Sequence, residues 1–314
     1  MIPATLVSLA ITLEILLLTL LGLGDLRARM AETIVLYLAS SLVYLVSAYI
    51  ILRNSPAVNA HPRLRMFIVA AALVFRVTAW PIAPALSDDI YRYRWEGRLQ
   101  ASGGNPYQAR PNDPEWAPLK DETFPLVVGK EVKAGYGPLL ELVERWTYRA
   151  VRSATPDPWR QAFWFKAPFA LFDLGAIAVL WILLRARGRP VQWVLLYAWS
   201  PLPVMEFWAT GHNDSAAIFL LLLALWAAAR RRWHWAFTWL SLAASTKFWP
   251  LLLFPLFIGW RNCRPQRWRE PLVALPIFAA TCWPYWSDVS ENIHFMSGFL
   301  GGWRNNDSLF GLLL

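Results

Sequence analysis

Apolar runs long enough to cross a membrane recur along this chain and leave it few possible folds. The first two, Ile2 to Leu23 and Thr33 to Leu52, approach the roughly 20 residues that span the hydrocarbon core. A chain in lipid must satisfy its backbone hydrogen bonds internally, so each run is expected to be a helix. With 57% apolar residues and 20 tryptophans, the composition differs from that of ordinary soluble domains. The sequence predicts an all-α polytopic membrane protein, a single module over residues 1–314 with about seven full spans.

The net charge of +9 is distributed as arginines in short links between the apolar runs. This placement indicates orientation in the membrane and excludes a basic nucleic-acid surface. By the positive-inside rule, the link with Arg53, Arg63 and Arg65 is cytoplasmic. The loop over residues 83–161 is then extracytoplasmic, and so is the link that carries Arg27, which departs from the rule.

Paired acids stand where the third apolar run leaves the membrane. The run Met66 to Trp80 is followed by two prolines and then by Ser87, Asp88 and Asp89. Carboxylates at the edge of hydrocarbon are costly, and in membrane proteins they usually mark substrate or ion sites. The alternative is that Ser87 or Asp88 merely caps the next helix. We expect the two aspartates to be the catalytic residues.

The extracytoplasmic loop contains two segments with helical patterns. Ile90 to Gln100 predicts a short amphipathic helix in the headgroup plane, and Pro138 suits the first turn of a second one. Two such interface helices would roof a cavity above the membrane. The first carries candidate substrate ligands at Arg92, Arg94 and Glu96.

Prolines interrupt a later span, Val191 to Thr210, which is tolerated where a helix lines a polar cavity. A polar cluster follows the break on the same predicted side as the aspartates. It consists of Glu206, His212, Asn213 and Asp214. A glutamate inside the membrane edge needs a partner, and we expect Arg98 or Lys247 to pair with Glu206.

The run from Trp235 to Trp260 has arginine clusters on both flanks. A single span would place one cluster outside. Two half-length helices that meet near Lys247 keep both clusters inside, so we expect a re-entrant hairpin over residues 235–260. A last span, Pro271 to Trp286, precedes a loop, and residues 308–314 read as the opening turns of a further span, which predicts that C-terminal spans are missing.

Taken together, these motifs resemble the polyprenyl-phosphate-dependent GT-C glycosyltransferases. The resemblance is closest to the bacterial polyprenyl-phosphate-mannose mannosyltransferases and to the GPI mannosyltransferase I catalytic subunit. It covers roughly residues 66–310 and lies in three motifs on one predicted membrane face: Ser87 to Tyr91 with Gly104 to Tyr107 downstream, Tyr136 to Leu139, and Ser200 to Leu202 with Glu206 and Gly211 to Asp214. It implies a GT-C-like bundle, an inverting mechanism and a bacterial inner membrane protein with an extracytoplasmic active site.

A sugar on a polyprenyl phosphate already has an activated anomeric carbon. Transfer then needs a base for the acceptor hydroxyl and a cation for the developing phosphate charge. The resemblance places the base at Asp88 or Asp89, and we favour Asp88, with Asp89 orienting. Candidate cations are Lys247, His212 and Arg92 or Arg94, and Tyr136 is a further candidate substrate ligand.

A single leaving phosphate can be met by fixed cations, so no metal or other cofactor is expected. Cys263 and Cys282 match no metal-ligand spacing. The expected partners are a lipid-linked sugar donor, a glycan or glycolipid acceptor and membrane lipids, but no nucleic acid.

Two other functions would also place polar groups in a membrane bundle. A transporter or flippase for a lipid-linked substrate is one, although such proteins tend to show repeated halves with matching broken helices, which this sequence lacks. An inactive GT-C-like subunit is the other, and it is an alternative because C-terminal spans are expected to be missing.

Overall fold

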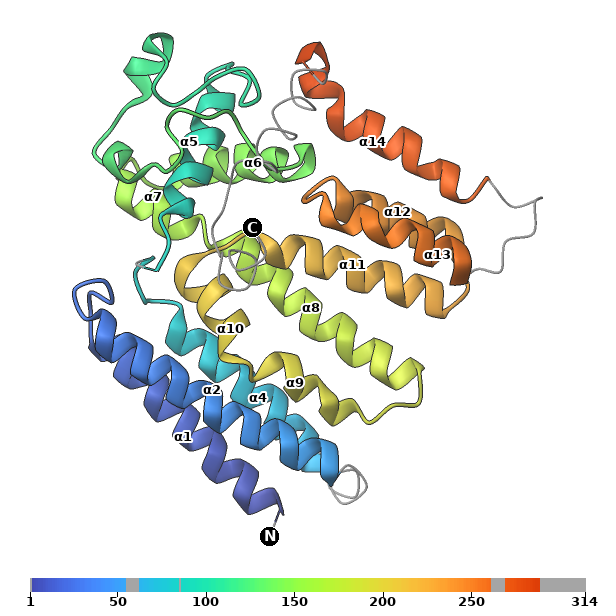
Figure 1. Ribbon diagram of the computed structural model, residues 1–314. Helices are drawn as coiled ribbons and strands as arrows, with labels where there is room; N and C mark the ends of the chain where they lie inside the picture. Colours follow the sequence, from blue (N-terminus) through green and yellow to red (C-terminus); the bar gives the residue numbers. More distant parts are fainter. Residues whose placement is uncertain (1, 55–61, 85, 261–268, 289–314) are drawn as a thin grey trace, which may run out of the picture.

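The computed structural model describes residues 2–54, 62–84, 86–260 and 269–288, and these residues form helices and connecting segments without β-strands. This confirms the all-α class (Figure 1). By length and composition, three described helices can cross a membrane: α1 (Ile2–Gly22), α2 (Met30–Arg53) and the continuous stretch Pro158–Ala186. The chain is therefore a membrane protein.

The first helices pack through a narrow apolar seam. The buried side chains of α1 recur at alternating spacings of four and three residues: Leu6, Ala10, Leu13, Leu17 and Leu20. That spacing keeps one helix face toward its neighbours, α2 and α4 (Pro62–Ala79). Leucines and isoleucines on the opposite face, such as Ile11 and Ile15, are exposed, as expected for contact with lipid.

A buried ion pair joins this first group of helices to the rest of the bundle. Arg76 of α4 is fully buried, and its Nε lies 2.6 Å from Oδ2 of Asp173 in α8 (Ala167–Ala186). Asp173 also accepts hydrogen bonds from Tyr197 and Trp208. Both charges of the pair are therefore neutralised and hydrogen-bonded. Charged residues inside a membrane bundle need such partners because burial of an unpaired charge is costly.

The expected extracytoplasmic loop forms a helical subdomain. It comprises α5 (Asp89–Ala101), two short 3₁₀ turns (Pro114–Leu119 and Phe124–Leu126), α6 (Pro138–Ala154) and α7 (Pro158–Trp164). In Figure 1 these elements group together at one end of the long helices.

The helix α5 differs from the amphipathic interface helix that the sequence predicts. Its side chains from Ile90 to Gly97 are all buried, because α6, α7 and the irregular segment over residues 103–137 surround it. Gly97 lets α6 approach closely, since a Cβ there would lie 2.5 Å from the carbonyl oxygen of Glu144. The helix α6 does have one apolar and one polar face.

The broken span appears where the prolines predict it. The chain runs through Val191–Val194, α9 (Leu195–Ala198), α10 (Pro201–Pro203) and a π-helical turn, η4 (Val204–Thr210). Proline removes a backbone donor, and π-helical turns often occur at functional sites. Gly211 ends the turn with a φ of +78°, a conformation that favours glycine.

The helices α12 (Trp233–Ala244) and α13 (Phe254–Trp260) form a hairpin. They come after α11 (Asp214–Ala229), and the turn η5 (Trp249–Leu253) precedes α13. The rings of Trp233 and Trp260 lie 5.9 Å apart, so the chain reverses direction near residues 245–248. The antiparallel pair agrees with the expected hairpin, whose placement in a bilayer stays a prediction.

The helix α14 (Ala274–Cys282), flanked by the turns Pro271–Val273 and Trp283–Asp288, packs beside α12 and α6. It corresponds to the last expected span. The C-terminal segment 308–314 and Cys263 lie outside the described residues.

Candidate active site

The two aspartates at the start of α5 have different partners. Asp88 forms an ion pair with Arg27, which comes from the link between α1 and α2. Asp88 occupies the N-cap position of α5, and the preceding residue, Ser87, accepts a hydrogen bond at its Oγ from the backbone N–H of Asp89 at 3.2 Å. Asp88 makes no side-chain capping bond. Its carboxylate is therefore held by a cation, and capping alone does not account for it.

Asp89 faces a histidine from the other side of the bundle. Its Oδ2 lies 3.6 Å from Nε2 of His212, whose Nδ1 is paired with the carboxylate of Glu206. The π-helical turn brings Glu206 and His212 together, and the backbone N–H of His212 donates to the carbonyl of Glu206 at 2.7 Å. Our expectation that Arg98 or Lys247 pairs with Glu206 is wrong, since Arg98 pairs with Asp121 and Lys247 with Asp214.

The surroundings of His212 favour its charged form. Burial alone would lower the pKa of the imidazole, but the hydrogen bond and charge of Glu206, and then the charges of Asp89 and Asp214, raise it above its ordinary value. A protonated His212 presents its Nε2–H toward Asp89 and adds a positive charge next to the carboxylates of Asp89 and Glu206.

Lys247 reaches the site from the tip of the hairpin. Its Nζ lies 2.6 Å from Oδ1 of Asp214 and 5.3 Å from the ring centre of Tyr136. Burial, followed by the charge of Asp89, raises the pKa of Tyr136 well above its ordinary value. Tyr136 therefore links the Lys247 group to the Asp89 group. Four parts of the chain meet here: the start of α5, the segment before α6, the turn η4 with the residues that follow it, and the hairpin tip.

Backbone hydrogen bonds fix the hairpin tip. The N–H groups of Gly137 and Leu139 donate to the carbonyls of Thr246 and Ser245, each at 2.9 Å. Gly137 is needed at this contact, because a Cβ would clash with the carbonyl oxygen of Ser245. The start of α6 thus holds the residue before Lys247.

Asn213 lies beside His212 and is almost fully buried, at 1% exposure. Neither its side-chain oxygen nor its nitrogen has a hydrogen-bond partner among the described residues. Unpaired buried amides are uncommon in folded proteins, so this one agrees with a role in binding.

The predicted ligands Arg92, Arg94 and Glu96 have internal partners. Arg92 binds Glu96 at 2.7 Å and the carbonyls of Gly129 and Val132 at 2.6 and 2.9 Å. These bonds hold the irregular segment against α5.

Arg94 binds Gln161, Thr123 and Asp121. Although burial opposes it, hydrogen bonds from Arg94 and Thr123 lower the pKa of Asp121. Both arginines therefore brace the subdomain, and the structure does not bring them into the group around Asp89.

Sequence reasoning missed two residues near the site. The predicted topology puts Arg27 on the same side of the membrane as the aspartates. The sequence of its link does not indicate that Arg27 pairs with Asp88. Lys166, at the start of α8, is fully buried and donates to the carbonyls of Trp80 and Ile82 at 2.5 and 3.0 Å. It holds the segment that leads to Asp88.

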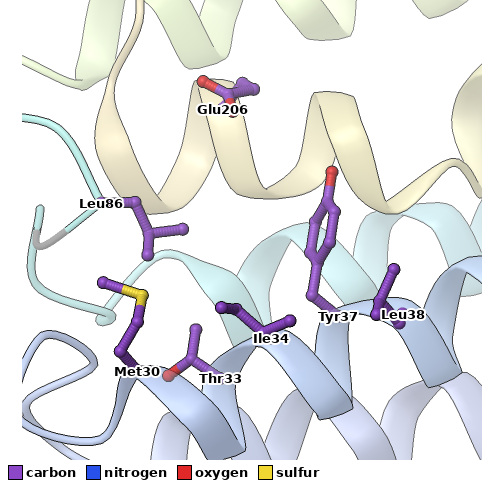
Figure 2. A pocket seen from close by; sticks show the side chains of 7 residues that line it. All are labelled: Met30, Thr33, Ile34, Tyr37, Leu38, Leu86 and Glu206. Atoms are coloured by element: carbon purple, nitrogen blue, oxygen red, sulfur yellow. The ribbon is translucent and has the colours of Figure 1, made fainter. Parts of the chain in front are cut away.

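An apolar pocket opens beside the polar group. It has a volume of about 230 Å³, lies between α2 and the turn η4, and is lined by Met30, Thr33, Ile34, Tyr37, Leu38, Leu86 and Glu206. Figure 2 shows Glu206 on one side and the α2 side chains on the other. Ile34 and Leu38 are 50% and 61% exposed, so the pocket is continuous with the surface that faces lipid. Glu206 connects it to His212.

Residues 5–264 match the family described as alpha-(1->6)-mannopyranosyltransferase, N-terminal domain, the MptA_B family. No curated protein and no solved structure gives a significant match. The family match spans well over half of the 314 residues and includes the aspartates, the polar cluster and the hairpin tip. It confirms the resemblance to the mannosyltransferases. The chain therefore belongs to the alpha-(1->6)-mannopyranosyltransferase family and is a membrane hexosyltransferase that transfers mannose.

Proposed function

We propose that this mannosyltransferase takes its sugar from a polyprenyl phosphate and transfers it, with inversion, to a hydroxyl of a lipid-linked or cell-envelope glycan. The observation that carries the donor assignment is the pocket between α2 and η4. It joins a lipid-facing apolar surface to a charged group, as an amphipathic lipid phosphate requires. The beginning of the isoprenoid chain would lie there and the rest would stay in the bilayer.

Two cations belong to ion pairs whose segments border this pocket. Arg27 comes from the link directly before α2, and His212 is bound to the pocket residue Glu206. A phosphate at the polar end of the pocket would meet both. Arg27 is 39% exposed at its side chain, so it can exchange Asp88 for a phosphate oxygen without desolvation of a deeply buried charge.

Transfer is a single displacement in this proposal. The acceptor oxygen bonds to the anomeric carbon from the face opposite the phosphate, the bond from that carbon to the phosphate oxygen breaks, and polyprenyl phosphate leaves. Asp88 takes the proton of the acceptor hydroxyl, and Asp89 orients the acceptor together with His212. A positioned carboxylate base typically accelerates such a step by about 10²- to 10⁴-fold.

Fixed cations meet the charge that develops on the leaving phosphate. We assign this role to Arg27, His212 and Lys247 and expect no metal in the chemical step. Removal of one preorganised donor to a developing charge typically costs about 3 kcal/mol, roughly a hundredfold in rate. Lys247→Met is expected to lose about that much activity, and the transfer rate per folded molecule is expected to survive EDTA.

The proposed active site faces the extracytoplasmic side of a bacterial inner membrane. The support is the arginine-rich links at the ends of α8 and α11, which the positive-inside rule assigns to the cytoplasm. Nucleotide sugars are cytoplasmic, so they should fail as donors.

The deciding experiment uses the purified full chain in nanodiscs with radiolabelled polyprenyl-phosphate-mannose and a membrane lipid extract. We expect label in a lipid or glycan product with the wild type and its near absence with Asp88→Asn. GDP-mannose serves as the control donor. Transfer from GDP-mannose alone, or transfer that EDTA abolishes and manganese restores, would overturn the mechanism. No transfer from either donor would favour an inactive GT-C-like subunit.

A further inference from the structure

Three glutamates gather inside the extracytoplasmic subdomain, away from the polar group around Asp89. Glu96 of α5 is 1% exposed, and Glu141 and Glu144 of α6 are fully buried. One carboxylate oxygen from each can be chosen so that all three lie within 4.8 Å of one another. None of these contacts is used in the proposed transfer reaction.

The cluster has too few donors for its acceptors. Arg92 donates to Glu96 at 2.7 Å, and Gln100 donates to Glu141 at 3.0 Å. One oxygen each of Glu96 and Glu141 and both oxygens of Glu144 receive no hydrogen bond from an N–H or O–H donor among the described residues. The side-chain contact that Glu144 does make is with the carboxyl group of Glu96, another acid. Glu144 is thus a completely buried side chain, directed into the cluster and without a donor of its own, which indicates a site for a positively charged ligand.

The net charge of the cluster indicates the sign and the magnitude of the charge on that ligand. Three carboxylates and the single guanidinium of Arg92 leave a net charge of −2 in a buried place. Unpaired charges in such a place cost several kcal/mol each. Burial, followed by mutual repulsion, raises the pKa of Glu144 and of Glu141 well above the ordinary value. Protons could neutralise the charge, but a divalent cation would also satisfy the orphaned oxygens.

The burial of the cluster distinguishes among divalent cations. Carboxylates are ligands for hard ions such as Ca²⁺ and Mg²⁺. Magnesium dehydrates reluctantly and usually keeps several waters, whereas calcium accepts a flexible shell of protein oxygens. Three carboxylates that are at most 1% exposed therefore favour calcium.

We propose that Glu96, Glu141 and Glu144 bind a calcium ion that clamps α5 to α6. The two helices approach each other closely here, because a Cβ at Gly97 would lie 2.5 Å from the carbonyl oxygen of Glu144. The cation would fix the helix that begins at Asp89 against the helix that follows Tyr136. Its role is structural, and the inference does not depend on the identity of the sugar donor.

The test uses the purified full chain in detergent, depleted with EGTA and measured without any sugar donor. Calcium binding is followed with ⁴⁵Ca²⁺, and thermal unfolding by tryptophan fluorescence, at about 1 mM calcium, the range of extracellular calcium modules. We expect one bound calcium per chain and a rise of several degrees in the unfolding midpoint. Magnesium at the same concentration should give a smaller rise.

Glu144→Gln keeps the size of the side chain and removes one ligand charge. It should lose the bound calcium and the calcium-dependent rise while remaining folded. The matched control, Glu115→Gln, changes an exposed glutamate of the same subdomain and should bind calcium as the wild type does. Absence of bound calcium in the wild type, with Glu144→Gln at least as stable at every calcium concentration, would show that protons neutralise the cluster and would overturn the proposal. Neither outcome bears on mannose transfer.

Discussion

Asp88 and Asp89 are neighbours in the sequence but belong to different groups in the structure. Asp88 is held by Arg27 from the first link, whereas Asp89 faces His212 beyond the broken span. Because their partners differ, the effects of substituting them can be separated.

The first prediction compares Asp88→Asn with Asp89→Asn. Asparagine keeps the size and most hydrogen bonds but cannot accept the proton, so Asp88→Asn should lose nearly all mannosyl transfer while inserting normally. Asp89→Asn should lose less. Initial rates in nanodiscs measure both, with tryptophan fluorescence as the check on folding. Wild-type rates for both variants would refute the assignment of these residues as catalytic.

A second prediction concerns pH. The pKa of His212 is raised, so its positive charge persists to higher pH than that of an ordinary imidazole and is lost as the pH rises through the raised pKa. Transfer should therefore decline on the alkaline side. His212→Gln should be about a hundredfold slower and should lack this decline. The control is His234→Gln, an exposed position on α12, whose pH profile should match the wild type. An unchanged alkaline limb in His212→Gln would contradict the role of the imidazolium.

Residue types in the site were predictable from the sequence, but most of their partners were not. Asp88, His212 and Lys247 stood out because charged groups at membrane boundaries are costly. Their pairing depends on which helix ends meet, and this is a property of the bundle. Arg98 was expected near Glu206, yet it is on α5 beside Asp121, within the packed subdomain.

At the scale of the elements, the position of the hairpin tip depends on a single small residue, Gly137. The tip binds the start of α6 through backbone groups, so its side chains do not determine the attachment. Gly137 allows this approach, and a misplacement of about 1 Å at a catalytic group can cost a hundredfold in rate.

We therefore predict that Gly137→Ala slows transfer by about a hundredfold, because the added methyl group pushes the Lys247 turn away from Tyr136. Gly259→Ala is the matched control, since a Cβ at this helical position meets nothing within 4 Å. Rates and unfolding midpoints of both variants provide the measurement. Equal rates for the two would mean that the tip is not positioned through Gly137.

The elements themselves were predicted unequally well. The break at Pro201 and the reversal near Lys247 followed from proline chemistry and from arginines on both flanks, which are local signals. The burial of α5 was not predictable, because it is covered by the irregular segment over residues 103–137, whose sequence has no periodicity that indicates where it packs.

At the scale of the whole molecule, the polar groups collect at one end of the bundle and the arginine-rich links at the other. The ion pair between Arg76 and Asp173 ties the first three helices to the later ones in this arrangement. If the bundle sits upright in a membrane, its two ends should differ in access to external reagents.

We predict that a cysteine at Asn112, an exposed position in the subdomain, reacts with an impermeant thiol reagent added outside intact cells. A cysteine at Ala186, at the exposed end of α8, should react only after the membrane is permeabilised. Both are made in a chain with Cys263→Ser and Cys282→Ser, which is also the control for background labelling. The reverse pattern would place the candidate site in the cytoplasm.

The contact between Gly137 and Thr246 also has a consequence for biosynthesis. A ribosome that adds roughly 5–20 residues per second needs about 5–20 s between the addition of Gly137 and the addition of Thr246. During that interval the aspartates, the link arginine and the first subdomain helices have already left the ribosome. The lysine that completes their group has not. If Lys247 has the role proposed for it, a nascent chain transfers mannose about a hundredfold more slowly until its hairpin has been inserted.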